Sequence, residues 1–186
     1  VGKSIATKLN SCFFSSGSIY RSVAKFLLNN KNVQIEDLKI EIVSEQCNVN
    51  GVIFNEEDLY DNEVSVKSSE IAKKVGLRIL VKDCLISYYK NLDKPLVIEG
   101  RDMGSVVFPD AEHKVYLDAD LETRGKRREG QSNMEETVLD VKKRDFEDKN
   151  RVFSPLTIPE GALVVDNSNL SIDETIELII KNLKLR

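Results

Sequence analysis

The sequence predicts an α/β protein with a parallel β-sheet and helical connections between its strands. Three short apolar runs occupy residues 95–98, 115–117 and 162–165, and each is bounded by Gly, Pro or Asp. Short runs rich in Val, Ile and Leu are typical of strands buried on both faces of a parallel sheet. Helical patterns alternate with these runs along the chain, which implies right-handed crossover connections.

Four stretches carry helical patterns. They occupy residues 4–9, 21–28, 71–89 and a segment that begins near residue 171. The last has the clearest start, because Ser171 can act as the N-cap and Glu174 follows three positions later. We expect the buried face of the third helix to comprise Val75, Ile79, Cys84, Leu85 and Tyr88. We expect the buried face of the last helix to comprise Ile172, Ile176, Ile179 and Ile180.

Residues 35–70 interrupt this alternation. The Asn50-Gly51 pair lies within an otherwise apolar stretch and is typical of the turn of a β-hairpin. Acidic and turn-forming residues follow it. We therefore predict a small insert with its own short antiparallel strands.

Length and charge limit the classes of function. The chain has 186 residues, which is enough for one domain with a good core. Lys and Arg number 27 and Asp and Glu number 31, a net charge of −4. This balance argues against broad binding of nucleic-acid polymers but allows a local basic pocket for a phosphorylated small molecule. Neither a membrane-spanning run nor a signal peptide is visible, so we expect a cytoplasmic protein without a membrane partner.

The cysteines and the histidine argue against thiol and zinc chemistry. The three cysteines, Cys12, Cys47 and Cys84, form no zinc-binding pattern, and we expect free thiols in a reducing compartment. His113 is the single histidine, which excludes histidine-rich metal chemistry.

A first phosphate signal opens the chain. Val1-Gly2-Lys3-Ser4 precedes a helix-forming run and matches the end of a G-x-x-x-x-G-K-[ST] phosphate loop. Such a loop needs backbone N–H groups and a lysine for phosphates, and a hydroxyl for Mg²⁺. An ordinary helix start is the alternative interpretation. We expect the first strand and the start of the loop to precede Val1.

A second signal lies at residues 15–21. A turn of small residues leads into a helix whose first turn carries Tyr20 and Arg21. Oriented N–H groups and a guanidinium suit a phosphate monoester. A plain N-cap followed by a surface arginine is the alternative.

A third signal follows the strand predicted at residues 95–98. Glu99, Arg101 and Asp102 lie here around Gly100, and Gly104 follows. Ligands of open α/β sheets bind at the carboxyl ends of strands, so this cluster predicts a ligand site. The alternative is a generic turn.

A fourth signal consists of two arginine clusters, at residues 124–128 and 144–151. Such charge runs usually form solvated helix faces with internal ion pairs. Phosphoryl transfer, however, requires arginines from a mobile segment over the developing negative charge. The two clusters flank the loop at residues 130–133, so they also suit a lid.

Together these motifs resemble the bacterial cytidylate kinase family, the P-loop kinases that phosphorylate CMP and dCMP with ATP. The match runs along the whole chain in the order V-G-K-S, S-G-S-I-Y-R, E-G-R-D-M-G-S-V-V-F-P-D-A, Y-L-D-A-D, R-x-x-R-R, R-D-x-x-D-x-N-R and P-L. The resemblance implies a three-layer P-loop kinase fold with a central parallel sheet, helices on both faces, a small nucleotide-binding insert and a short lid. It implies one kinase domain over residues 1–186, a nucleotide-monophosphate-binding insert over 35–70 and a lid over 124–151. It also implies ATP and Mg²⁺ as cofactors, CMP or dCMP as the small-molecule substrate, and a monomer.

The resemblance further assigns roles to individual residues. The ATP phosphates would contact Val1, Gly2, Lys3 and Ser4. The metal ion would contact Ser4 and Glu99. The catalytic cations would be Lys3, Arg101, Arg124, Arg127 and Arg128. The acceptor nucleotide would contact Ser16, Tyr20, Arg21, Lys82, Arg101, Asp102, Arg144, Asp148 and Arg151.

Three positions depart from the family pattern. Ser15 and Glu99 each replace an aspartate, and Lys82 stands loosely where the family has an arginine. An ammonium in place of a guanidinium would bind phosphate as a point charge and not bidentately. Two other functions remain open: a different small P-loop kinase acting on UMP, dAMP or shikimate, and a catalytically silent nucleotide-binding module.

Overall fold

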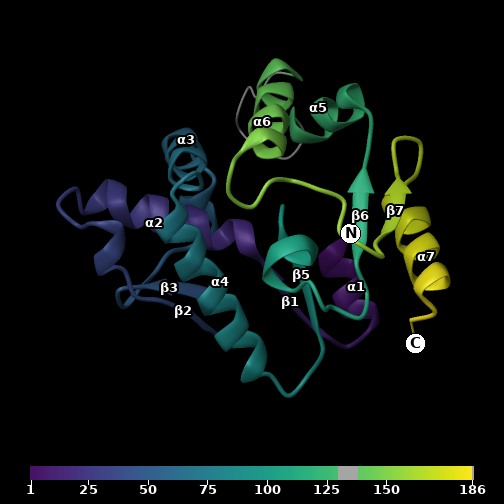
Figure 1. Ribbon diagram of the computed structural model, residues 1–186, viewed down its shortest axis with the longest axis horizontal. Helices are drawn as coiled ribbons and strands as arrows, with labels where there is room; N and C mark the ends of the chain where they lie inside the picture. Colours follow the sequence, from purple (N-terminus) through teal and green to yellow (C-terminus); the bar gives the residue numbers. More distant parts are fainter. Residues whose placement is uncertain (130–137, 186) are drawn as a thin grey trace. The chain divides into compact units, whose positions relative to one another are not determined.

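The computed structural model describes residues 1–129 and 138–185 (Figure 1). The chain divides into two compact units. The first comprises Val1–Ser11 and Arg101–Arg186, and the second comprises Cys12–Gly100. Each unit contains a pair of parallel strands together with helices. The predicted α/β class with parallel strands is confirmed.

The second unit is built on two parallel strands, β1 (Cys12–Ser15) and β5 (Leu96–Glu99). Cys12 lies opposite Leu96, and Ser15 lies opposite Glu99. The sequence predicts β5 but not β1. The Cys-Phe-Phe-Ser stretch shows no alternation of apolar and polar residues, and it becomes a strand through its pairing with β5.

Three helices accompany these strands: α2 (Ser16–Asn29), α3 (Asn62–Ile71) and α4 (Val75–Lys90). In Figure 1, α3 lies beside α2, and the two helices are in contact. The prediction of one helix over residues 71–89 is wrong at its start, because residues 72–74 are not helical and separate α3 from α4. The helix α3 begins at its own N-cap, where the Asp61 carboxylate accepts a hydrogen bond from the Val64 N–H at 2.7 Å.

The buried face of α4 differs from the predicted one. Val75 and Ile79 are 47% and 48% exposed. Because α4 begins only at Val75, the side that packs inward is set by its neighbours α2 and β2 and not by the pattern of the preceding segment. The apolar side chains buried from α4 are Leu77, Val81, Cys84 and Leu85.

Residues 35–70 contain the antiparallel strands that the sequence predicts there. The strands are β2 (Ile40–Val43), β3 (Gln46–Val49) and β4 (Val52–Ile53), each pairing with the next. Asn50 and Gly51 connect β3 to β4 with φ angles of 50° and 85°. This left-handed conformation favours Asn and Gly, which confirms the predicted hairpin turn. Two short 3₁₀ turns, Ile35–Asp37 and Glu56–Leu59, flank the sheet.

The first unit contains the second parallel pair. Its helices and strands are α1 (Gly2–Lys8), β6 (Val115–Asp118), α5 (Leu121–Glu129), α6 (Val138–Asn150), β7 (Leu163–Asp166) and α7 (Ile172–Leu183). The prediction that these strands are buried on both faces is wrong for Leu117 and Val164, which are 42% and 51% exposed. The pair β6–β7 has no third strand among the described residues, so its side chains are less covered than those inside a wide sheet.

The capping box of α7 is confirmed. The Ser171 hydroxyl accepts a hydrogen bond from the Glu174 N–H, and the Glu174 carboxylate accepts one from the Ser171 N–H. Ile176 and Ile179 are buried as predicted, but Ile172 is 62% exposed. Ile172 is the first residue of the helix and lies a turn before the buried part of the stripe. Along the described chain, no helix combines the length and the apolar character that crossing a bilayer requires.

Candidate active-site residues

Three arginines and two aspartates of the first unit form a continuous chain of ion pairs. Arg101 contacts both aspartates, with Nη1 3.5 Å from Oδ1 of Asp145 and Nε 3.3 Å from Oδ2 of Asp148. Arg124 pairs with the other oxygen of Asp145 through its Nη1. Arg151 Nη1 lies 3.0 Å from Oδ1 of Asp148. The order of charges is therefore Arg124, Asp145, Arg101, Asp148 and Arg151.

The helix α6 organises this network. Asp145 and Asp148 lie three residues apart, which places both carboxylates on one face of the helix. Their side chains are 14% and 16% exposed, whereas the Arg101 side chain is 39% exposed. The carboxylates are thus covered, and the central guanidinium reaches solvent. Three positive and two negative charges leave an excess of one positive charge, which suits an anion such as a phosphate.

The segment after α6 folds back onto the same network. Arg151 Nε donates a hydrogen bond to the Ser154 carbonyl, and the Leu156 N–H donates to the Asp148 carbonyl at 2.8 Å. Ser154 is buried and has a φ of 53°. The backbone therefore supports the Arg151–Asp148 pair from two sides.

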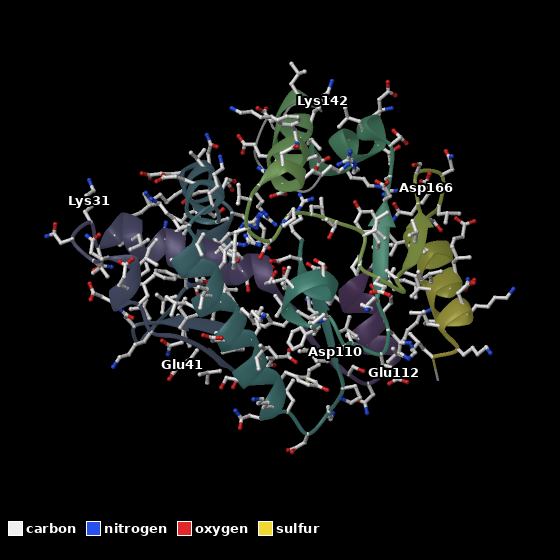
Figure 2. The ribbon with its side chains drawn as sticks, viewed as in Figure 1. Lys31, Glu41, Asp110, Glu112, Lys142 and Asp166 are labelled. Carbon is white, nitrogen blue, oxygen red and sulfur yellow. The ribbon has the colours of Figure 1, made fainter. Side chains whose placement is uncertain are left out.

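Two further predicted arginines are Arg127 and Arg144. Arg127 donates from Nη1 to the Asn167 side chain at 3.0 Å and from Nη2 to the Asn167 carbonyl at 2.8 Å. It thus holds the loop that follows β7. Arg144 is half-buried on α6, where the neighbouring Lys142 is exposed (Figure 2). The Arg128 side chain and the predicted lid loop at residues 130–133 lie outside the described part of the structure.

Asp102 lies at the start of a single wide helical turn, Met103–Val107. Its side chain is buried, with the residue 7% exposed. Its carbonyl accepts hydrogen bonds from the N–H groups of Val106 and Val107 at 2.9 and 3.2 Å. The turn therefore fixes the backbone at Asp102, one of the residues that the family resemblance assigns to the acceptor nucleotide.

The predicted ATP-binding residues begin α1. The Ile5 N–H donates to the Val1 carbonyl at 2.9 Å, so the preceding N–H groups of Gly2, Lys3 and Ser4 belong to the first helical turn. Lys3 is exposed and Ser4 is half-buried. First-turn amides, an ammonium and a hydroxyl are the donor set that phosphates and Mg²⁺ require, so these residues fit both groups.

The second predicted metal contact, Glu99, is exposed at the end of β5 in the second unit. Across residues 1–129 and 138–185, no three or more His, Cys, Asp or Glu side chains gather into a metal-binding group. A metal ion would therefore need oxygen ligands from the nucleotide as well as from the chain.

The predicted acceptor-site residues of the second unit lie on α2 and α4. Ser16 is buried at the start of α2, and Tyr20 and Arg21 follow one turn later. The Arg21 guanidinium carbon lies 4.5 Å from the centre of the Tyr60 ring. Lys82 is half-buried on α4. Tyr60 was not predicted as a site residue, because it stands among acidic turn residues and carries no motif of its own.

Arg78 is a second residue that sequence analysis missed. It is 5% exposed, and its guanidinium carbon lies 5.7 Å from the centre of the Tyr20 ring. Its Nη1 donates to the Ala72 carbonyl at 2.9 Å, at the C-terminal end of α3. One arginine thus connects α4, α3 and the second turn of α2. The available signal was an arginine within the apolar run Leu77–Val81.

Aspartates gather at the carboxyl ends of β6 and β7. Asp166, labelled in Figure 2, accepts a hydrogen bond from the Ser168 hydroxyl at 2.6 Å, and this bond lowers the pKa of its carboxyl group. The Thr123 N–H lowers the pKa of Asp120 in the same way. The Ser168 hydroxyl also accepts from the Asp120 N–H at 2.8 Å, which joins the two loops.

A mixed α/β fold with parallel strands and arginine-rich phosphate-binding candidates defines a protein of the P-loop kinase class. A family profile described as Cytidylate kinase matches residues 1–185. The cytidylate kinase of Clostridium botulinum (strain Okra / Type B1) is 32% identical over 199 residues, which cover 99% of this chain and 91% of the relative. That of Borrelia duttonii is 29% identical over 205 residues, covering 100% and 92%. That of Mycoplasmopsis pulmonis is 32% identical over 197 residues, covering 97% and 87%. The chain belongs to the cytidylate kinase family.

Proposed function

We propose that this protein transfers the terminal phosphoryl group of ATP to CMP or dCMP and so produces CDP or dCDP. The observation that carries the proposal is the family match over residues 1–185. The ion-pair network supports it, because Arg101, Arg124 and Arg151 come from separate segments and converge on two carboxylates of α6.

The acceptor phosphate oxygen is already a nucleophile, so the reaction needs no strong base. Catalysis consists of in-line positioning and stabilisation of the negative charge on the transferring group. Lys3 and the arginines Arg101, Arg124, Arg127 and Arg128 supply this positive charge. The first-turn residues Val1, Gly2, Lys3 and Ser4 hold the ATP phosphates.

Ser4 and Glu99 would hold Mg²⁺, which would neutralise charge on the nucleotide phosphates. The chain's own contribution is to orient the nucleotide and to exclude water. Segment 124–151 acts as the lid that does this, and closure of such a lid protects ATP from hydrolysis.

Arg101 binds the acceptor phosphate. In the structure its guanidinium is held by Asp145 and Asp148, so it is already oriented before any ligand arrives. A phosphate monoester carries up to two negative charges spread over three oxygens. These oxygens suit bidentate contact, so the phosphate can displace a carboxylate from one side of a guanidinium. The pre-oriented arginine therefore gives up little conformational entropy on binding.

The remaining contacts define the acceptor. Asp102 accepts a hydrogen bond from the exocyclic amine of cytosine, which uracil lacks, and Asp148 and Arg151 contact sugar and base. A base without this amine would forgo the hydrogen bond to Asp102, at a cost of about 1–3 kcal/mol. The other acceptor contacts are Ser16, Tyr20, Arg21, Lys82 and Arg144. Residues 35–70 form the nucleotide-monophosphate-binding insert, and the protein acts as a cytoplasmic monomer.

The test is ATP turnover with Mg²⁺ by the full-length protein, with CMP, dCMP, UMP, AMP and shikimate as acceptors. Turnover confined to the cytidine nucleotides supports the proposal and the role of Asp102. Turnover with another acceptor would support a kinase activity but refute the base-reading role of Asp102. ATP binding without turnover with any acceptor would contradict the proposal and indicate a silent binding module.

A further inference from the structure

The loop between the small antiparallel sheet and α3 is attached to α2 through two adjacent residues. The Tyr60 ring lies against the Arg21 guanidinium, with 4.5 Å between the guanidinium carbon and the ring centre. The next residue, Asp61, pairs with Lys25 Nζ at 3.2 Å. Arg21 and Lys25 are four residues apart and therefore share one face of α2. The two contacts form a clamp made of Tyr60, Asp61, Arg21 and Lys25.

The two contacts of the clamp have different roles. The Lys25–Asp61 pair is an exposed ion pair, and its carboxylate also caps α3, so its effect is local and structural. The Tyr60 contact involves the guanidinium of a residue in the first part of α2, next to Tyr20. A ring stacked on a guanidinium covers its flat face and leaves the N–H groups directed outward around its edge.

Such stacking has a consequence for anion binding. A guanidinium binds phosphate through the N–H groups in its plane, so the ring and the anion occupy different sides of the group and do not compete. The ring also restricts a long side chain that would otherwise lose rotamer entropy when it binds an anion. Tyr60 is 46% exposed and Arg21 is half-buried, so the contact lies near the protein surface.

We propose that Tyr60 is a positioning residue that orients the Arg21 guanidinium for the phosphate of the acceptor nucleotide. This inference rests on the proposed function, which assigns Arg21 to the acceptor site. Tyr60 itself acts through Arg21 and not on the reacting atoms. Tyr60, which lies in segment 35–70, is thus a determinant of the affinity for the acceptor nucleotide.

The experiment compares three variants of the full-length protein. Tyr60→Leu removes the ring face but keeps an apolar side chain, Tyr60→Phe keeps the ring face and removes only the hydroxyl, and Lys25→Gln breaks the other half of the clamp. We expect Tyr60→Leu to raise the KM for CMP about three- to tenfold while kcat and the KM for ATP stay within about twofold. Tyr60→Phe and Lys25→Gln should resemble the wild type.

A second readout does not depend on turnover. A proton above a ring face is shifted upfield by the ring current, so the Arg21 Nε–H resonance should lie upfield in the wild type and in Tyr60→Phe. It should return to its ordinary position in Tyr60→Leu. Equilibrium binding of CMP, measured by calorimetry without ATP, should weaken about three- to tenfold in Tyr60→Leu alone.

The outcomes separate the inference from the proposed function. An upfield resonance without CMP turnover in the wild type would refute the proposed function and leave the stack intact. An upfield resonance with CMP turnover, but unchanged CMP affinity in Tyr60→Leu, would refute the inference alone. Equal weakening of CMP binding in Tyr60→Leu and Lys25→Gln would also overturn the inference, because the clamp would then act only by attaching the loop to α2.

Discussion

Arg101 occupies the centre of the ion-pair network because the two carboxylates of α6 contact it from different sides. Asp145 and Asp148 each bind a second arginine, so each aspartate is shared between two guanidinium groups. In such a network the carboxylates determine where the arginines point, and the arginines provide the affinity for anions. Substitution of an arginine and substitution of an aspartate should therefore affect catalysis in different ways.

Replacing Arg101 with alanine should remove catalysis and leave the fold intact. The side chain is 39% exposed, so its loss leaves no buried cavity. We expect Arg101→Ala to lower kcat about 10²- to 10³-fold, as is typical when a group that stabilises transition-state charge is removed. Steady-state kinetics with CMP and a thermal melt measure the two effects. A loss of activity matched by a large fall in Tm would contradict this expectation.

Replacing Asp145 with asparagine tests whether the carboxylates position the arginines. Asp145 contacts both Arg101 and Arg124, so its neutralisation should loosen two arginines at once. We expect a fall in kcat of between about 10- and 100-fold, because misplacement by about 1 Å can cost about 10² in rate. Combining Asp145→Asn with Arg124→Ala should give less than the product of the single effects. Fully multiplicative effects would show that the residues act independently.

The buried cysteines should be unreactive in the folded protein. Burial raises the pKa of the Cys47 thiol to about 11, against a smaller lowering by the Ser22 hydroxyl, and raises that of Cys84 to about 12. At pH 8 a thiol of pKa 11 is about one part in a thousand thiolate. A thiol-reactive chromogenic reagent should therefore label only Cys12 rapidly in native protein and all three cysteines in denaturant. Rapid labelling of Cys47 or Cys84 under native conditions would contradict the packing described here.

At the level of elements, the start of α3 depends on local capping by Asp61. The Val64 N–H lowers the pKa of Asp61, and the Lys25 ammonium contributes to the same shift. Since the folded-state pKa is below the unfolded one, the stabilisation is present above the ordinary aspartate pKa and is lost as pH falls through the folded-state pKa. The cap therefore stabilises α3 at neutral pH and not in acid.

Replacing Asp61 with alanine should lower the free energy of unfolding by about 1 kcal/mol at pH 7, the typical cost of losing an N-cap. The difference from wild type should shrink below about pH 4, where the wild-type carboxylate becomes protonated. Denaturant titrations at several pH values measure this. Asp61→Asn is the matched control, because an amide oxygen still caps the helix without titrating. A pH-independent difference for Asp61→Ala would refute the electrostatic part of the explanation.

At the level of the whole molecule, the candidate residues are distributed over two compact units. The ion-pair network belongs to the first unit, and Ser16, Tyr20 and Arg21 belong to the second. The family match extends across both units without interruption. A ligand that binds only the folded chain should stabilise it against unfolding.

Addition of CMP should raise the thermal midpoint of the protein. At a concentration 100 times its Kd, a ligand that binds only the folded state stabilises by about 2.7 kcal/mol. For a chain of this size that corresponds to about 5–10 °C in Tm. Differential scanning fluorimetry with CMP and UMP measures the shift, and Arg101→Ala should lose most of it. A CMP shift that is the same in Arg101→Ala would place the acceptor phosphate elsewhere.

Parts of the fold that depend on interactions between residues close in sequence were predictable. The capping box of Ser171 and Glu174 and the hairpin turn at Asn50-Gly51 follow from side-chain hydrogen bonding and backbone freedom over a few residues. Local interactions did not make the strand β1 or the interruption before α4 predictable. A strand of four residues exists through its partner, and which face of α4 is buried depends on the elements that pack against it.

The candidate site divides in the same manner. The sequence by itself determined the family and the residue types, because phosphate chemistry requires Gly, Lys, Ser and Arg in patterns that survive as local motifs. Only the tertiary structure decided that Asp145 holds two arginines. The same is true of the contacts of Arg78 with the Tyr20 ring and of Arg21 with the Tyr60 ring. The physical reason is that ion pairs and stacking depend on distance in space, and their partners here lie between 21 and 58 residues apart.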